Sequence, residues 1–340
     1  MMLMRGLRFR SLSFMVVTGL FLTGVSPAHA VTGLTAAKNE VDRLRTLAAT
    51  KFERANGLKY QIGNLQSEQL KLQNTELLAK GKVDSAQVQV ARIAVERYKG
   101  SGFSSGFDLL FSNDPSQYLR DAASLTLLSR NYQTKIQHLK TYKQELQASR
   151  FVLQDRTTQL KNAQRSLSVE VLSAQRDLLN AEKVLSALSK KDRIRLAKAE
   201  KAAQSRDLLV SKKIAKSFGG GSSRGAIALR FALNQLGDIY VWGGAGPSRW
   251  DCSGLTLRSF AKAGASLPHS AAIQFNYGKP IGFNQVKPGD LLFYGTPISH
   301  VSIYMGGGRM VQAPRPGKKV EIVPYTRMFG YKPFIGAKRI

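Results

Sequence analysis

Cys252 is the single cysteine of the 340-residue chain and lies in the run Asp251-Cys252-Ser253-Gly254. A lone cysteine is commonly a small buried apolar residue, and it reacts only where its thiol is accessible and its pKa is low. Helical spacing of apolar residues from Leu255 to Ala263 predicts a helix that begins at the cysteine. The N–H groups and dipole at a helix start stabilise a thiolate and an oxyanion, so Cys252 is a candidate nucleophile.

A cysteine nucleophile needs an imidazole base and a group that orients the imidazole. His300 opens a strand pattern, and Gln312 follows twelve residues later. A hairpin through Gly306 to Gly308 would place the Gln312 amide beside His300, where the amide oxygen can accept a hydrogen bond from the ring. The second histidine of this region, His269, lies in a predicted loop or helix start.

The residues of the C-terminal segment argue against two other kinds of site. Residues 218–340 hold 15 basic side chains but only four acidic ones, which are Asp238, Asp251, Asp290 and Glu321. A glycosidase uses a pair of catalytic carboxylates, and so small a set of acidic residues argues against one. Two histidines and one cysteine do not resemble a zinc site, so we expect no metal and no cofactor.

The amino terminus predicts export. Three arginines within the first ten residues precede an apolar run from Leu12 to Val25, and Ala28-His29-Ala30 supplies small residues for cleavage after Ala30. We therefore expect residues 1–30 to be a secretory signal peptide and the protein to be secreted, at the cell wall or cell surface. An uncleaved anchor is the alternative, but the run is shorter than the about 20 residues that a spanning helix needs.

The net charge of +29 indicates a polyanionic neighbour. Nucleic acid, anionic lipid and an acidic cell wall would all suit this charge, but export and the lack of a recognisable nucleic-acid module argue against nucleic acid. A single cysteine in an exported chain cannot form an internal disulfide. This favours a free thiol over an intermolecular bridge or a buried filler.

Residues 31–217 show the seven-residue apolar repeat of a coiled coil. One row is Leu34, Val41, Ala48, Ala55 and Ile62, and another is Leu139, Leu146, Leu153, Leu160, Leu167, Ala174, Ala181 and Leu188. Glycines and a proline between residues 100 and 115 interrupt the repeat, so the two runs should form an antiparallel hairpin with this segment near its tip. The second arm is much longer than the first, so it must break, run alone or pack on the next domain.

Two segments of this helical region could contact something else. The apolar run Phe107 to Phe111 lies at the otherwise polar tip, and it either packs on itself or docks a partner or membrane. Lys190 to Lys216 is rich in lysine, arginine and alanine, which is typical of a solvated helix. We hypothesise that this second segment contacts and restrains the catalytic domain.

The pattern changes after a Gly/Ser linker at residues 218–223. Residues 224–340 show helical spacing at 226–236, 255–263 and 270–275, followed by strand patterns at 291–294, 301–305, 310–312, 320–323 and 334–340. Helices followed by strands predict an α+β domain. The expected organisation is a signal peptide (1–30), a coiled-coil regulatory or docking domain (31–217), a linker (218–223) and a catalytic domain (224–340).

Five motifs in residues 224–340 resemble the NlpC family of bacterial cell-wall cysteine endopeptidases, which have a papain-like α+β fold. The motifs are Tyr240-Val241-Trp242-Gly243-Gly244, Asp251-Cys252-Ser253-Gly254-Leu255, Lys287-Pro288-Gly289-Asp290-Leu291, His300-Val301-Ser302-Ile303-Tyr304 and Met310-Val311-Gln312-Ala313-Pro314. The resemblance implies that Cys252 is the nucleophile, His300 the general base and Gln312 the orienting residue.

Other positions of this resemblance imply substrate contacts. Tyr240 matches the family tyrosine near the thiol, and Asp251 and Ser253 match residues that line the substrate cleft. Alternatively, Asp251 and Ser253 simply cap the helix. His269 stands where relatives usually have an arginine.

The helical region resembles the coiled coils of some cell-division peptidoglycan hydrolases, in which the coil restrains the enzyme and docks a membrane complex of the FtsEX type. Together, the resemblances imply a secreted endopeptidase that cuts a peptidoglycan stem peptide, between γ-D-glutamate and diaminopimelate or lysine, in wall remodelling or daughter-cell separation. The implied partners are stem peptides, anionic wall polymers and an FtsEX-type complex at the tip near Phe107 to Phe111. The alternatives are a non-hydrolytic scaffold that activates another wall hydrolase, and an amidase or acyltransferase on the same fold.

Overall fold

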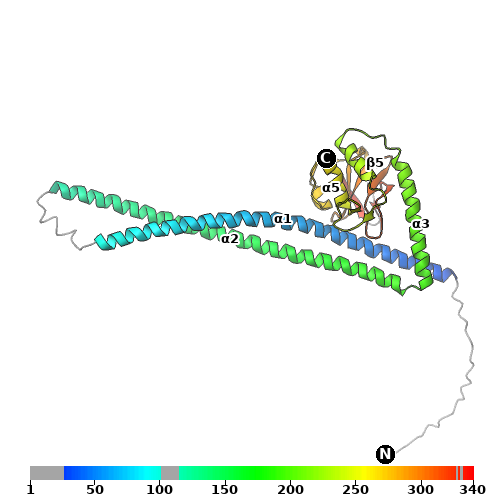
Figure 1. Ribbon diagram of the computed structural model, residues 1–340, viewed down its shortest axis with the longest axis horizontal. Helices are drawn as coiled ribbons and strands as arrows, with labels where there is room; N and C mark the ends of the chain where they lie inside the picture. Colours follow the sequence, from blue (N-terminus) through cyan, green and yellow to red (C-terminus); the bar gives the residue numbers. More distant parts are fainter. Residues whose placement is uncertain (1–26, 101–114, 327, 330–331) are drawn as a thin grey trace, which may run out of the picture.

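The computed structural model describes residues 27–100, 115–326, 328–329 and 332–340. Two long helices, α1 (Pro27–Gly100) and α2 (Pro115–Ala187), run antiparallel and side by side (Figure 1). Most of the predicted signal peptide and the predicted docking run Phe107 to Phe111 lie outside the described residues. Of the helices within the described ranges, none is long and apolar enough to cross a membrane.

The seven-residue repeat forms the seam between α1 and α2. Its members are buried in successive small clusters: Val41 and Leu44 with Ala181, Ala48 with Ala174, Ile62 and Leu65 with Leu160, and Ala79 and Val83 with Leu146. Residue numbers rise along α1 as they fall along α2, which confirms the antiparallel hairpin. Each cluster is small, so the two helices are held by many separate contacts along their length.

The second arm breaks between α2 and α3 (Lys190–Ala215). Ser189 begins α3 by accepting a hydrogen bond from the Asp192 N–H at 3.1 Å, which is a usual helix start. From this turn α3 runs toward the C-terminal part of the chain (Figure 1). The Gln204 amide donates to the Gly317 carbonyl at 3.0 Å, and the Ser211 hydroxyl accepts from the Ile322 N–H at 3.0 Å. The predicted contact of this segment is confirmed, while a restraining effect on activity stays a prediction.

The C-terminal part, from α4 (Arg224–Leu233) onward, has the predicted α+β fold. Its sheet has the order β3-β9-β4-β5-β6-β7, all antiparallel, with β8 paired to β9. The strands are β3 (Lys279–Ile281), β4 (Leu291–Tyr294), β5 (His300–Gly306), β6 (Arg309–Gln312), β7 (Glu321–Pro324), β8 (Met328–Phe329) and β9 (Lys332–Arg339). A separate parallel pair, β1 (Ile239–Tyr240) and β2 (Arg249–Trp250), and a 3-10 turn (Phe283–Gln285) complete the part.

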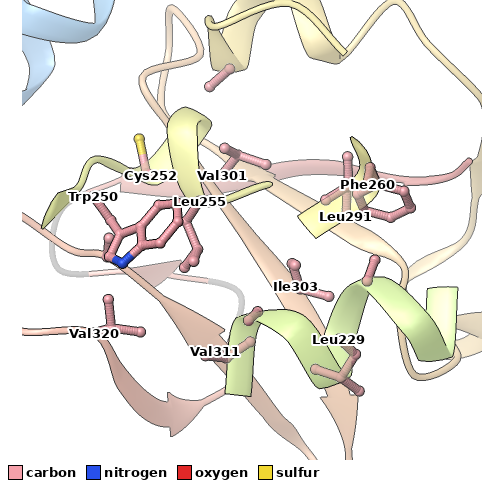
Figure 2. Close-up of a cluster of buried hydrophobic side chains, with 14 of the residues drawn as sticks. Leu229, Trp250, Cys252, Leu255, Phe260, Leu291, Val301, Ile303, Val311 and Val320 are labelled. Carbon is pink, nitrogen blue, oxygen red and sulfur yellow. The ribbon is translucent and has the colours of Figure 1, made fainter. Parts of the chain in front are cut away.

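Alternation along the central strands sends apolar side chains to both faces of the sheet. Helices α4 and α5 (Cys252–Lys262) cover one face, where Leu229 and Leu255 join a cluster with strand residues such as Val301 and Ile303 (Figure 2). Leu292, Tyr294, Met310 and Ala337 form a second buried cluster. The short helix α6 (Ala271–Gln274) lies between the sheet and α1. Cys252 therefore begins a helix that is fixed against a rigid sheet.

Candidate active site

The thiol of Cys252 lies at the first position of α5, as predicted. Asp251 caps this helix, because its Oδ1 accepts a hydrogen bond from the Gly254 N–H at 2.7 Å. The Val301 N–H on β5 donates to the sulfur. Figure 2 shows Cys252 at the start of α5 beside Val301, with its sulfur directed away from the labelled core side chains. A strand residue and a helix cap thus fix the thiol from two sides.

His300 and Gln312 meet across the β5–β6 hairpin, as predicted. The His300 Nε2 and the Gln312 Oε1 are 2.7 Å apart, and both side chains are fully buried. An amide oxygen can only accept, so Nε2 carries the hydrogen and Nδ1 is the basic nitrogen. The Gln312 Nε2 donates to Glu321 at 3.3 Å, which fixes the orientation of the amide. Glu321 was not predicted, since its place beside Gln312 depends on the β6–β7 pairing.

The Cys252 thiol and the His300 imidazole both favour their uncharged forms at neutral pH. Burial, and then the charges of Glu53 and Asp251, raise the pKa of the Cys252 thiol well above its ordinary value. Burial, and then Lys332, lower the pKa of His300 to about 3. A thiolate with an imidazolium is therefore disfavoured as long as the site stays covered.

Helix α1 covers the thiol. Cys252 is 4% exposed and Glu53 of α1 is 3% exposed. The Glu53 Oε2 accepts hydrogen bonds from the Ser253 hydroxyl at 2.9 Å and from the Cys252 thiol at 3.5 Å. The Glu53 Oε1 accepts from the Ala271 N–H. A side chain of the coiled coil thus occupies the space next to the Cys252 thiol.

Three further residues of α1 hold it against the C-terminal part. The Phe52 ring stacks on Trp242 with centroids 4.5 Å apart, and the Trp242 indole N–H donates to the Phe52 carbonyl at 2.9 Å and to the Asn56 Oδ1 at 3.0 Å. The Asn56 Nδ2 donates to the Asp251 Oδ2 at 3.0 Å. The Lys59 ammonium also lies over the Trp242 ring, 4.3 Å from its centroid. The cover is therefore a specific interface of stacked rings and paired polar groups.

Asp251 is the centre of the polar network. Besides Gly254 and Asn56, it accepts from the Gly243 N–H at 2.7 Å and pairs with His269 Nε2 at 2.8 Å. Burial opposes protonation of His269, but the Asp251 carboxylate outweighs it and raises the pKa of His269. With all these partners Asp251 fixes the first turn of α5, and a contact of Asp251 with substrate stays a prediction.

The other predicted substrate residues lie close to the thiol. Tyr240 is buried, and burial, followed by the charges of Cys252, Asp251 and Glu53, raises the pKa of its hydroxyl. Ser253 is fully buried under Glu53. Glu53 of α1 covers Ser253, and the contacts of both side chains with substrate stay predictions.

Sequence reasoning missed Lys332 on β9. Lys332 is 4% exposed, its ammonium donates to the Ser299 carbonyl at 3.2 Å, and its charge acts on Cys252 and His300. Burial lowers the pKa of Lys332 to about 8. Glu53, Phe52 and Asn56 were missed too, because no local pattern shows which face of a coiled-coil helix meets a distant domain. Within the described residues, no group of three or more His, Cys, Asp or Glu side chains could hold a metal ion.

A thiol at a helix start, packed on a sheet whose strand carries an imidazole with an amide acceptor, is the arrangement of a cysteine peptidase. Residues 237–339 match the NlpC/P60 family, so the C-terminal part of the chain is an NlpC/P60 domain.

Two sequence relatives agree with the family match. The chain is 40% identical over 129 residues to the peptidoglycan endopeptidase RipA of Mycobacterium tuberculosis, which covers 34% of this chain and 27% of that protein. It is 49% identical over 92 residues to the probable endopeptidase p60 of Listeria monocytogenes, which covers 26% of this chain and 19% of the relative. A solved NlpC/P60 family protein from Bacillus cereus is 29% identical with a TM-score of 0.32, over 34% of this chain and 39% of that one. The chain thus spans well under a third of the length of these two sequence relatives.

Proposed function

We propose that the protein is a secreted peptidoglycan endopeptidase that cuts an amide of the stem peptide with Cys252 as nucleophile. The observation that carries the proposal is the Cys252 thiol at the start of α5, which accepts a hydrogen bond from the Val301 N–H of β5, next to His300 in the chain. His300 Nε2 in turn lies 2.7 Å from Gln312 Oε1. The relatives named as endopeptidases support the reaction type. The scissile bond is the amide between γ-D-glutamate and diaminopimelate or lysine, as the sequence resemblance implies.

The reaction follows from the chemistry of these groups. His300 Nδ1 takes the thiol proton, and the thiolate adds to the amide carbonyl while first-turn N–H groups of α5 stabilise the oxyanion. Gln312 holds the imidazole through Nε2. The excess of basic residues, with a net charge of +29, supports binding to anionic wall polymers. A docking site for an FtsEX-type complex at the tip, and a role in daughter-cell separation, belong to the same proposal.

The chain is latent with α1 in place. The thiol is buried, its pKa is raised, and the donors around it are occupied by Glu53. Movement of α1 away from Trp242 and Asp251 exposes the site. Helix α3 and the salt bridge between Asp42 and Arg315, at 2.7 Å, hold other points of the same interface.

Digestion of purified peptidoglycan tests the proposed function. A Phe52→Ala variant loses the stack on Trp242 and should release muropeptides faster than the unaltered chain, with fragment masses that identify the bond. Adding Cys252→Ala to this variant should abolish release, because the nucleophile is gone. Equal release with and without Cys252 would favour the non-hydrolytic scaffold, and fragments that point to another bond would favour an amidase or acyltransferase.

A further inference from the structure

The carboxylate of Glu53 occupies a built set of hydrogen-bond donors at the thiol. The Ser253 hydroxyl donates to Oε2 at 2.9 Å, the Ala271 N–H donates to Oε1, and the Asn56 amide lies 3.4 Å from Oε2. Oε2 is also 3.5 Å from the Cys252 sulfur. The donors from Ser253 and Ala271 belong to the C-terminal part and remain when α1 leaves.

Packing alone does not call for a carboxylate at this position. Phe52 and Asn56 already supply the stacked ring and the amide pairs of the interface. Burying a carboxyl beside the Asp251 carboxylate is unfavourable, since burial and then Asp251 raise the pKa of Glu53 to about 7. A neutral apolar side chain would avoid this penalty, but it would leave the Ser253 hydroxyl and the Ala271 N–H buried without an acceptor. The position of Glu53 therefore marks a place where the C-terminal part is fitted to an acid group.

The chemistry of the proposed reaction indicates which acid group of the substrate would bind at this place. A glutamate side chain is two methylenes that end in a carboxyl group. Hydrolysis of an amide on the γ-carboxyl of a glutamyl residue leaves the same group, and leaves it next to the nucleophile. In an ordinary peptide product the new carboxyl would instead sit on a branched α-carbon.

We propose that Glu53 is an internal product analogue: its carboxyl occupies the subsite that receives the γ-carboxylate released from a substrate glutamyl residue. The subsite consists of the Ser253 hydroxyl and the Ala271 N–H beside Cys252. This inference rests on the proposed function and specifies which half of the substrate lies over these donors. It also explains why the cover of the site carries an acid.

A second, independent observation points to the same subsite. The Ser270 hydroxyl is fully buried, and among the described residues it has no hydrogen-bond partner. Ser270 immediately precedes Ala271 in the chain. Its hydroxyl lies 3.4 Å from the position that a Cβ on Gly57 of α1 would occupy. Removal of α1 therefore exposes a third donor at this place. A groove of about 510 Å³ continues from Glu53 along α1, and its wall on the C-terminal part, which includes Ser270 and Ile273, remains when α1 leaves.

The reaction at this subsite balances as a hydrolysis. The Cys252 thiolate adds to the γ-carbonyl, the C–N bond breaks, and the His300 imidazolium gives its proton to the leaving amine. Water then adds to the thioester, His300 takes a proton from it, and the C–S bond breaks. The products are a γ-carboxylate, which the Ser253 and Ala271 donors hold, and an amine.

Thiol alkylation in the full-length chain tests the proposal. Glu53→Ala removes the internal carboxyl and should raise the rate of iodoacetamide reaction at Cys252 by about tenfold or more. Glu68→Ala is the matched control, because Glu68 lies on the same helix and pairs with Arg156 of α2. Its rate should equal that of the unaltered chain. Equal rates for the Glu53→Ala and Glu68→Ala variants would overturn the proposal.

Two dipeptide probes then identify the group that the subsite binds. L-alanyl-D-isoglutamine has a free γ-carboxylate, and L-alanyl-D-glutamine has a γ-amide with a free α-carboxylate. The first should slow alkylation of the Glu53→Ala variant and the second should not. Adding Ser270→Ala should weaken this protection. Equal protection by both probes, or by neither, contradicts the proposal.

The Phe52→Ala variant keeps Glu53 and serves as a second opened form. There the probes must compete with Glu53, so protection by L-alanyl-D-isoglutamine should need a higher concentration than in Glu53→Ala. Failure of the proposed function has a different signature, which is muropeptide release that does not depend on Cys252. Cys252-dependent release without selectivity for the γ-carboxylate would leave the function standing and refute the product analogue.

Discussion

Gln312 is held on both sides, and its neighbours explain why an amide suits this position. Its oxygen accepts from His300 at 2.7 Å and its nitrogen donates to Glu321 at 3.3 Å. A carboxylate at residue 312 would face the Glu321 carboxylate, and like charges at that distance cannot both ionise readily. The amide avoids this repulsion, but it stabilises an imidazolium less than a carboxylate would.

Substitution of Gln312 should weaken the base. Because the hydrogen bond from His300 to Gln312 raises the pKa of His300, Gln312→Ala should lower this pKa and free the ring to rotate. We expect kcat/KM to fall by about 10- to 100-fold, with its acidic limb shifted to lower pH. The measurement is a pH profile of cleavage in the Phe52→Ala background. Gln159→Ala, on the exposed side of α2, is the control and should leave the profile unchanged.

Helix α1 packs against α2 with one face and against the C-terminal part with another. Its seven-residue row, with Val41, Ala48 and Ile62, packs on α2, while Phe52, Glu53 and Asn56 lie on the side that meets the C-terminal part. In Figure 1 the C-terminal part lies over α1, on the side away from α2. A shift of α1 along its seam with α2 would therefore move the covering side chains as one unit.

Helix α5 is placed by a close backbone approach at Gly254. A Cβ there would stand 2.1 Å from the Gly244 carbonyl oxygen and 2.9 Å from His269 Nε2. The first turn, and with it Cys252, is thus fixed against the loop between β1 and β2. A glycine at this position is required by space.

Gly254→Ala should destabilise the C-terminal part. We expect a loss of about 1–3 kcal/mol or more in its unfolding free energy, since backbone atoms must shift to admit the methyl group. Both tryptophans of the chain, Trp242 and Trp250, lie in this part, so denaturant unfolding followed by tryptophan fluorescence reports it. Gly63→Ala is the matched control, because a Cβ there meets nothing within 4 Å and alanine favours the helix. If both variants unfold alike, close packing at Gly254 is not what places α5.

At the scale of the whole molecule, a helix distant in sequence covers the Cys252 thiol. Three regions far apart in sequence meet at the thiol: Glu53 of the coil, Cys252 of α5 and Val301 of β5. Asp42 of α1 with Arg315, and Ser211 of α3 with Ile322, join the helical region to the C-terminal part at other points. The proposed opening would therefore move the helical region against the C-terminal part.

This opening should depend on pH. Glu53 has a pKa of about 7 when covered and an ordinary value of 4.5 when exposed, and Asp251, Cys252 and His269 face the same carboxyl. The raised pKa means that the closed form is fully stabilised below pH 4.5 and loses this stabilisation as pH rises to about 7, because the open form ionises first. The open fraction should therefore grow over this range.

The rate of Cys252 alkylation in the unaltered chain, divided by the rate in Glu53→Gln, isolates this effect. Glutamine does not titrate, so the ratio removes the ordinary ionisation of the thiol and the contribution of His269. The ratio should rise from pH 5 to 7 and level off above that. A ratio that is flat or falls would show that Glu53 does not control opening through its charge.

The sequence by itself determined the local parts of this protein. The seven-residue repeat specified the hairpin, the helical pattern after Cys252 specified where α5 begins, and the spacing of His300, the glycines and Gln312 specified a hairpin that joins base and orienting residue. These features follow from residues near one another in the chain, whose periodicity and turn chemistry act locally.

Only the tertiary structure decided what lies on the thiol. Glu53 is 199 residues from Cys252, and nothing in a heptad pattern shows which outward face of α1 will meet another domain. The same holds for Glu321 and Lys332, whose positions depend on strand pairing and on the path of β9. Buried polar contacts of this kind arise where distant segments pack, because their free energy depends on partners and burial that local sequence does not contain.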